Sequence, residues 1–134
     1  MPRAPVPPDL AAFLAAPRPS VVAVLRADGS PVTAATWYEW DDGKVLLPML
    51  RSSWRLRHVR RDPRIALTVL GDSWYSQVSV LGRVVEIRDD GFADIDRISM
   101  SYFGEPYTPR DAEIASVIFD VERWHAWLDV NQRG

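Results

Sequence analysis

Residues 47–64 read Leu47-Pro-Met-Leu-Arg-Ser-Ser-Trp-Arg-Leu-Arg-His-Val-Arg-Arg-Asp-Pro-Arg64. The apolar run from Val45 to Leu50 predicts a strand, and Ser52-Ser53 is typical of a helix start, because serine oxygens accept hydrogen bonds from the free N–H groups of a first turn. We expect a helix from about Ser53 to Arg61. It should stop at Asp62-Pro63, since the residue before a proline disfavours helical backbone. This stretch therefore predicts a strand, a turn and a short basic helix.

The predicted helix and its flanks contain one acidic residue, Asp62, and six arginines: Arg51, Arg55, Arg57, Arg60, Arg61 and Arg64. A helix start has free N–H donors and a positive dipole end, and nearby guanidinium groups make it a favourable site for an anion, above all phosphate. Helical residues two apart point away from each other, so Arg55 and Arg57 cannot share a face. Leu56 and Val59, three apart, should be buried. We therefore assign Arg55, Ser52 and Ser53 to the anion, and a solvated helix face is the alternative.

Length and composition limit the possible classes of protein. We expect residues 1–134 to form a single domain, and 47% hydrophobic and 25% charged residues are ordinary for a globular protein. A net charge of -2 argues against a dedicated nucleic-acid-binding protein. The chain has no cysteine and two histidines, so no metal site is predicted. No apolar stretch is long enough to cross a bilayer, and we expect a cytoplasmic protein without a membrane partner.

The remaining pattern predicts a mainly β protein with short helices. Strands are expected at residues 20–26, 31–40, 44–50, 64–70, 74–88 and 112–121, the first three forming a meander, and residues 122–130 should make a short terminal segment. Helices are expected at residues 10–16, capped by Asp9, at 53–61 and at 89–103, where Phe92, Ile95, Ile98 and Met100 lie near one stripe. Gly82, inside a strand, indicates a bend or a close backbone approach. Six strands with helices in two connections are typical of a closed or split β-barrel.

Motifs for common catalytic and nucleotide sites are missing from the sequence. There is no Gly-x-Ser-x-Gly elbow, no Gly-x-Gly-x-x-Gly and no P-loop. His58 and His125 are isolated and are more often structural than catalytic. The sequence therefore identifies no catalytic residue.

Several stretches resemble one known family. They are Ala27-Asp-Gly-Ser-Pro31, Ala35-Thr-Trp-Tyr38, Asp41-Asp-Gly-Lys44, Arg51-Ser-Ser-Trp-Arg55, His58-Val-Arg-Arg-Asp-Pro-Arg64, Val80-Leu-Gly-Arg-Val-Val-Glu86 and Tyr102-Phe-Gly-Glu-Pro-Tyr107. Across residues 10–128 the chain resembles the pyridoxamine 5'-phosphate oxidase-like superfamily of split-barrel proteins, which bind FMN or a deazaflavin. The resemblance is closest to the branch that uses the deazaflavin coenzyme F-420.

The resemblance implies where a cofactor would bind. Its phosphate would lie after the third strand, where the family pattern Ser-Arg-Lys is replaced by Ser53-Trp54-Arg55, and its ring would lie along the second and third strands. It also implies a homodimer, and Trp74 and Tyr75 are the best candidates to cover a site of the other subunit. The candidate cofactor-binding residues are Thr33, Ala34, Ala35, Thr36, Pro48, Met49, Leu50, Arg51, Ser52, Ser53, Arg55, Arg57 and Trp74.

The function implied is an oxidoreductase that uses F-420 for hydride transfer to a small planar unsaturated substrate, such as an enone, a quinone or a tetrapyrrole. Tyr38, Tyr75 and His58 are the candidate proton donors, and nothing in the sequence chooses among them. One alternative is an FMN-binding oxidoreductase or flavin carrier of the same fold. The other is a non-catalytic module that binds anions or nucleic acid through the arginine-rich helix.

Overall fold

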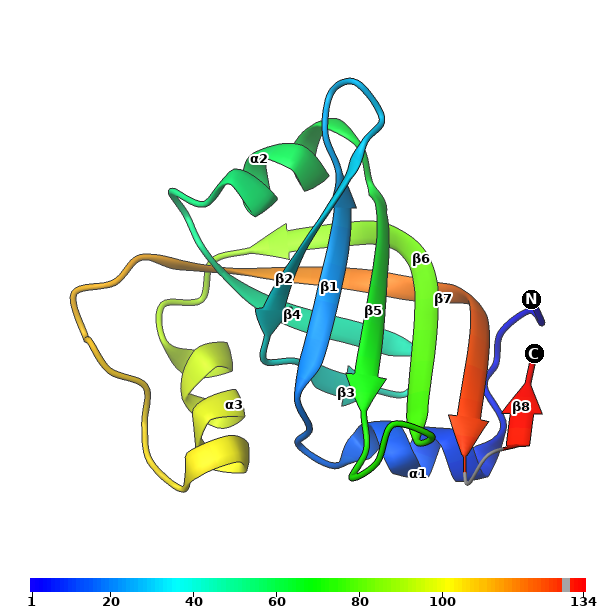
Figure 1. The fold of residues 1–134 in the computed structure, drawn as a ribbon. Helices are drawn as coiled ribbons and strands as arrows, with labels where there is room; N and C mark the ends of the chain where they lie inside the picture. Colours follow the sequence, from blue (N-terminus) through cyan, green and yellow to red (C-terminus); the bar gives the residue numbers. More distant parts are fainter. Residues whose placement is uncertain (129–130) are drawn as a thin grey trace.

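A computed structural model of the protein describes residues 1–128 and 131–134 (Figure 1). The described residues contain the helices α1 (Pro8–Ala15), α2 (Trp54–Arg61) and α3 (Ala93–Phe103). Their strands are β1 (Ser20–Leu25), β2 (Pro31–Thr36), β3 (Glu39–Asp41), β4 (Lys44–Leu50), β5 (Arg64–Leu70), β6 (Gln77–Arg88), β7 (Ile114–Leu128) and β8 (Asn131–Arg133).

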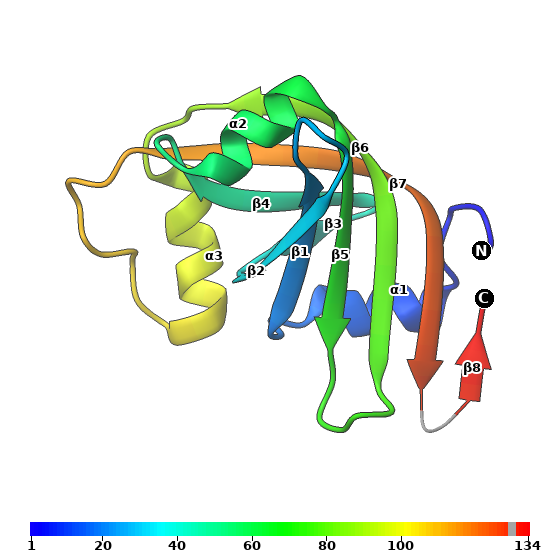
Figure 2. The ribbon, with the colours of Figure 1, turned by 45° about the horizontal axis from the view of Figure 1, so that its top comes forward.

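The strands form one antiparallel sheet in the order β2-β1-β5-β6-β7-β4-β3, with β8 paired to the end of β7. β6 and β7 pair with each other over most of their lengths, while β5 pairs with the first half of β6 and β4 with the first half of β7. Both ribbon views show β6 and β7 bending, so that β1 and β5 cross β4 steeply (Figures 1 and 2). The predicted split β-barrel with short helices is confirmed.

Gly82 lies at the bend of β6. The register with β7 shifts between Leu81 and Gly82, and again between Val84 and Glu86. A Cβ atom at position 82 would lie 1.7 Å from the carbonyl oxygen of Asp120, a distance that no side chain tolerates. The expectation of a close backbone approach at Gly82 is therefore confirmed, and glycine is required there.

Both hairpins of the predicted meander are present, since β1 pairs with β2 and β3 with β4, but its middle strand is not continuous. The expected strand 31–40 breaks after Thr36 into β2 and β3, and β4 pairs with β3 and β7. The break follows from Tyr38, whose ring is buried in the core and whose single hydroxyl proton is shared between the carbonyl oxygens of Leu14 and Ala16, at O···O distances of 2.7 and 2.8 Å. The chain turns there so that Tyr38 can hold the end of α1. With β3 and β8, the described residues form eight strands where six were expected.

Several expected boundaries also shift. α1 starts at Pro8, and Asp9 does not cap it but forms an ion pair with Arg133. β6 starts at Gln77 rather than at residue 74, and β7 continues through the predicted terminal segment to Leu128. The end of that predicted segment, residues 129 and 130, lies outside the described residues. α3 begins at residue 93, and Met100 is half exposed rather than part of its buried stripe.

The core lies inside the barrel and is built from alternate strand residues. Among the largest fully buried side chains are Leu47, Met49, Leu67 and Phe119. α1 packs against one end of the barrel (Figure 1). On α2, Leu56 and Val59 are buried as predicted. No helix in the described part of the chain is both long and apolar enough to span a bilayer.

α3 is fixed to the barrel by a buried carboxylate. Asp94 is 2% exposed and accepts two hydrogen bonds of 2.9 Å from Arg88 and one of 2.8 Å from Arg97. Burial alone would raise the pKa of Asp94, but the hydrogen bonds from Arg88, Ser116 and Arg97 outweigh it and hold the pKa well below its usual range. Arg97 also binds Glu39 of β3. These contacts set the position of α3 beside β4.

Replacing Gly82 with alanine should destabilise the protein by about 1–3 kcal/mol, because the backbones of β6 and β7 would have to separate. Urea denaturation measures the change. Val85→Ala is the control, since Val85 lies on the same strand and is exposed, and it should alter stability by less than about 0.5 kcal/mol. Equal unfolding midpoints for the two variants would contradict the requirement for glycine at the bend.

Candidate functional site

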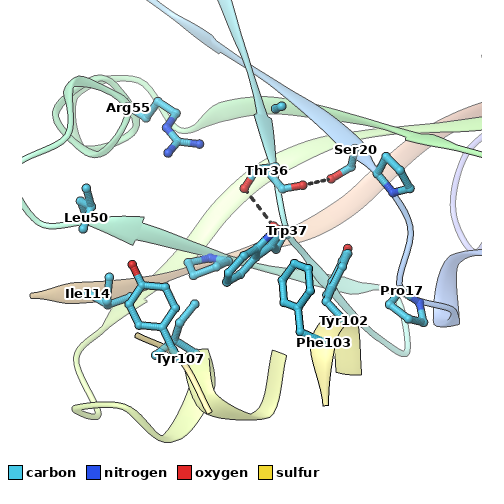
Figure 3. A pocket seen from close by; sticks show the side chains of 14 residues that line it. Pro17, Ser20, Thr36, Trp37, Leu50, Arg55, Tyr102, Phe103, Tyr107 and Ile114 are labelled. Atoms are coloured by element: carbon cyan, nitrogen blue, oxygen red, sulfur yellow. Dashed lines mark hydrogen bonds between the residues drawn. The ribbon is translucent and has the colours of Figure 1, made fainter. Parts of the chain in front are cut away.

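A cavity of about 620 Å³ opens between α3 and the barrel (Figure 3). This volume is in the range of small-molecule sites. Its walls come from the ends of β2 and β4, from α2, from α3 and from the segment that follows α3. The lining residues are Pro17, Pro19, Ser20, Ala35, Thr36, Trp37, Pro48, Leu50, Arg55, Ile95, Tyr102, Phe103, Tyr107 and Ile114.

Aromatic rings form one wall of the cavity. Trp37, which follows β2, lies 5.0 Å from Phe103, 5.9 Å from Tyr107 and 6.0 Å from Tyr102, measured between ring centroids. The contacts with Phe103 and Tyr107 are edge-to-face, and the ring of Tyr102 is stacked. Such pairs hold aromatic side chains in defined orientations. The wall therefore offers ordered apolar surface to a flat molecule.

Arg55 enters the cavity from α2, on the side facing these rings (Figure 3). Its Nη1 atom is buried and has no hydrogen-bond partner among the described residues. Burial lowers the pKa of Arg55, but a guanidinium stays charged at any physiological pH. Arg55 is also the only charged residue among the described residues that line the cavity. A buried, uncompensated cation is costly, and an anionic group of a ligand would satisfy it.

The hydroxyls near the end of β2 are already engaged. Ser20 donates a hydrogen bond of 2.7 Å to the carbonyl oxygen of Thr36, and Thr36 donates one of 2.9 Å to the carbonyl oxygen of Trp37 (Figure 3). These bonds join β1 to β2 and fix the chain where it leaves the sheet. They position Trp37 at the wall of the cavity.

The structure brings five of the candidate cofactor-binding residues together around this cavity: Ala35, Thr36, Pro48, Leu50 and Arg55. Their places follow from the ends of β2 and β4 and from the first turn of α2. These five remain the best-placed candidates for contact with a cofactor.

Other candidates lie elsewhere. Strand alternation turns Met49, 1% exposed, and Ala34 toward the core. Ser53 is the N-cap of α2, where its oxygen accepts a hydrogen bond of 3.3 Å from the N–H of Leu56. Three more are exposed and outside the cavity: Thr33, Ser52 and Trp74, the last at 92%.

Arg51 and Arg57 line a second cavity, of about 350 Å³. Arg60, Arg88 and Asp89 are also part of its wall, and Arg51 forms an ion pair with Asp89. The two cavities lie at the same end of β4 and β7, because Leu50 and Ile114 line the first while Arg51 and Ala115 line the second. The arginines assigned to one site are therefore divided between an apolar cavity and a separate polar one.

The three candidate proton donors do not line the large cavity. Tyr38 is buried in the core, and burial raises the pKa of its hydroxyl. The ring of Tyr75 stacks on that of Trp127, with 6.4 Å between the ring centroids, and neither residue lines the large cavity. His58 bonds Arg61 at 2.9 Å, and desolvation and neighbouring arginines lower its pKa.

Sequence reasoning missed most of the aromatic wall. Trp37, Tyr102, Phe103 and Tyr107 were not among the candidates, although residues 102–107 were part of the family resemblance. Three aromatic residues within six positions, at the end of a helix and just beyond it, are a detectable signal. The sequence does not show which residue these three rings contact, since Trp37 lies more than sixty residues before them in the chain.

Comparison with known proteins is consistent with this architecture. The pyridoxamine 5'-phosphate oxidase family model matches residues 6–128. A solved structure described as an F-420 reductase is 25% identical, with a TM-score of 0.81, and the match covers 89% of this chain and 98% of that one. No curated protein sequence matches.

Two further solved structures share the fold. A conserved hypothetical protein from Mycobacterium tuberculosis is 24% identical with a TM-score of 0.70, over 93% of this chain and 86% of that one. General stress protein 26 from Bacillus anthracis is 14% identical with a TM-score of 0.70, over 89% and 92%. With the family model covering almost its whole length, the chain belongs to the pyridoxamine 5'-phosphate oxidase family. The family resemblance seen in the sequence is confirmed.

Replacing Arg55 with methionine should stabilise the ligand-free protein by about 1 kcal/mol, because it removes a half-buried charge that has no partner among the described residues and keeps much of the side-chain volume. Thermal denaturation of the cofactor-free protein measures this. Arg60→Met is the matched control, since Arg60 is exposed on the same helix and its replacement should change stability little. An Arg55→Met protein less stable than Arg60→Met would show that Arg55 has a structural role instead.

Proposed function

We propose that this protein is an oxidoreductase that binds the deazaflavin coenzyme F-420 and reduces a small planar unsaturated substrate. The observation that carries the proposal is the half-buried guanidinium of Arg55, whose buried Nη1 atom has no hydrogen-bond partner among the described residues, at the edge of an apolar aromatic cavity. The cofactor phosphate would take this guanidinium as a charge-assisted partner. The flat ring would lie among the apolar walls.

The polar cavity beside the site favours the deazaflavin over FMN. F-420 carries an anionic polyglutamate tail beyond its phosphate, as the family resemblance implies, and FMN has none. Arg57 and Arg60 line the second cavity, where a tail leaving the phosphate near Arg55 would find cations. Two other arginines of that cavity already have partners, Arg51 in Asp89 and Arg88 in Asp94. Each exposed charge pair contributes about 0.2–1 kcal/mol, so two or three pairs would give roughly tenfold preference.

The chemistry of the reaction would come mainly from the cofactor: when bound, a reduced deazaflavin supplies a hydride. The residues of this chain would orient the cofactor and the acceptor and shield them from water. Pro48, Leu50 and Ile114 exclude water from one wall, and the ordered rings of Trp37 and Phe103 hold a flat acceptor from the other. A dry, ordered cavity keeps the reacting groups together and suppresses side reactions.

The proposal includes a homodimer. The β5–β6 connection exposes Trp74 almost completely, and Leu70 and Tyr75 beside it are also exposed. Large apolar side chains gathered on one surface are typical of an interface. Light scattering at micromolar concentration should give twice the chain mass of 15.2 kDa. Trp74→Ser should shift the protein toward monomer, and a monomeric wild-type protein at that concentration would overturn the dimer.

The cofactor is tested by titrating the purified protein with F-420 and, separately, with FMN, and following the ring absorbance. F-420 should bind about tenfold more tightly at low salt. The preference should shrink toward ~0.5 M salt, because screening weakens the exposed pairs with the tail. Tighter binding of FMN at every ionic strength would replace the deazaflavin with FMN in this proposal, and binding of neither would overturn the proposal.

Arg55→Ala tests the phosphate contact in the same titration. It should weaken binding of both cofactors by about 1.5–3 kcal/mol, the range for a hydrogen bond to a charged group. Arg60→Ala makes the same change of charge on the same helix and should leave FMN binding unchanged. Equal weakening of FMN binding by both variants would indicate long-range charge rather than a contact of Arg55.

A further inference from the structure

Tyr107 is held in place by its backbone. Its N–H donates a hydrogen bond of 2.9 Å to Oδ1 of Asp96 on α3, and its carbonyl oxygen accepts one of 3.3 Å from Arg110. Arg110 also donates to the same Asp96 oxygen at 2.7 Å, and its guanidinium lies 4.0 Å from the ring centroid of Phe92. The segment after α3 is therefore fastened to the helix on both sides of Tyr107.

The side chain of Tyr107 points into the large cavity. Its ring meets Trp37 edge-to-face at 5.9 Å. In Figure 3 its hydroxyl points toward the side of the cavity from which Arg55 enters. The hydrogen bonds that Tyr107 makes to described residues all involve its backbone. The hydroxyl is thus an oriented donor that faces the ligand space.

The other hydroxyls in the cavity wall have their donors engaged. Tyr102 donates a hydrogen bond of 2.7 Å to the carbonyl oxygen of Arg18, and burial raises the pKa of its hydroxyl. Ser20 and Thr36 donate to the carbonyl oxygens described above. Among the described residues that line the cavity, Tyr107 therefore has the one hydroxyl that remains ready to bind a ligand oxygen.

We infer that the Tyr107 hydroxyl donates a hydrogen bond to the carbonyl oxygen of the substrate, and so selects conjugated carbonyl compounds among planar apolar molecules. This inference rests on the proposed function and names the substrate class of the same site. In an apolar cavity the hydrogen bond makes the carbonyl more electrophilic, which favours hydride addition to the conjugated system. A ligand of the same shape without the oxygen would cover the hydroxyl and displace its water without offering an acceptor, and sites that lose a hydrogen bond in this way bind such a ligand less tightly. Tyr107 is then a specificity-determining residue that contacts the substrate.

The test compares two probes of similar shape, menadione, which has two ring carbonyls, and 2-methylnaphthalene, which has none. Ligand-observed NMR measures the affinity of each for the cofactor-free protein and for the protein with oxidised F-420, so no turnover is needed. Tyr107→Phe should weaken menadione binding about two- to tenfold, as expected for one hydrogen bond, and leave 2-methylnaphthalene binding unchanged. Tyr102→Phe is the matched control, and it should leave the ratio of the two affinities as in the wild type.

Each outcome decides the inference. An unchanged affinity ratio in Tyr107→Phe overturns it, as does an equal change in Tyr102→Phe. Weaker F-420 binding by Tyr107→Phe with unchanged menadione binding would assign the hydroxyl to the cofactor instead. The proposed function fails separately: if neither F-420 nor FMN binds the wild type while Tyr107→Phe still loses menadione selectively, the carbonyl site stands without the cofactor.

Discussion

The contact between the backbone of Gly82 and the carbonyl of Asp120 is the constraint on which the rest of the fold depends. It lets β6 and β7 bend together while they stay paired, so that β5 extends one half of the sheet and β4 the other. Because β4 belongs to the second half, the chain must cross back to β5 on the first half. α2 makes that crossing and brings Arg55 to the edge of the barrel. The bend thus determines where the buried cation lies.

A second constraint acts on the opposite wall of the cavity. The Tyr38 hydroxyl holds the end of α1 and interrupts the strand that would otherwise join β2 to β3. The interruption leaves Trp37 outside the regular sheet, where it contacts the aromatic residues at the end of α3. The buried carboxylate of Asp94 fixes α3 at the distance that these contacts need. One wall of the site is therefore a consequence of how the barrel core is closed.

Local signals in the sequence predicted much of this structure. The Ser53 cap, the proline that ends α2, the buried pair Leu56 and Val59 and the glycine at the bend all depend on neighbouring residues, and the structure has each as expected. The pairing of β4 with β7 was missed, because strand alternation shows which face is buried but not which strand is the partner. For the same reason the sequence indicated Arg55 but not the rings opposite it. Their approach is a property of the closed barrel and not of any short segment.

The guanidinium of Arg55 has no partner among the described residues, and with the proposed ligand as its partner it would also link the stability of the protein to the supply of that ligand. A group that is costly in the ligand-free state and satisfied in the bound state raises the share of folded chains when ligand is abundant. At a free ligand concentration one hundred times the Kd, binding raises the free energy of unfolding by about 2.7 kcal/mol. Chains made before the ligand is present would be unfolded more often and exposed to proteases for longer. The amount of this protein in a cell would then follow the synthesis of the ligand, without a regulator that senses the protein or the ligand.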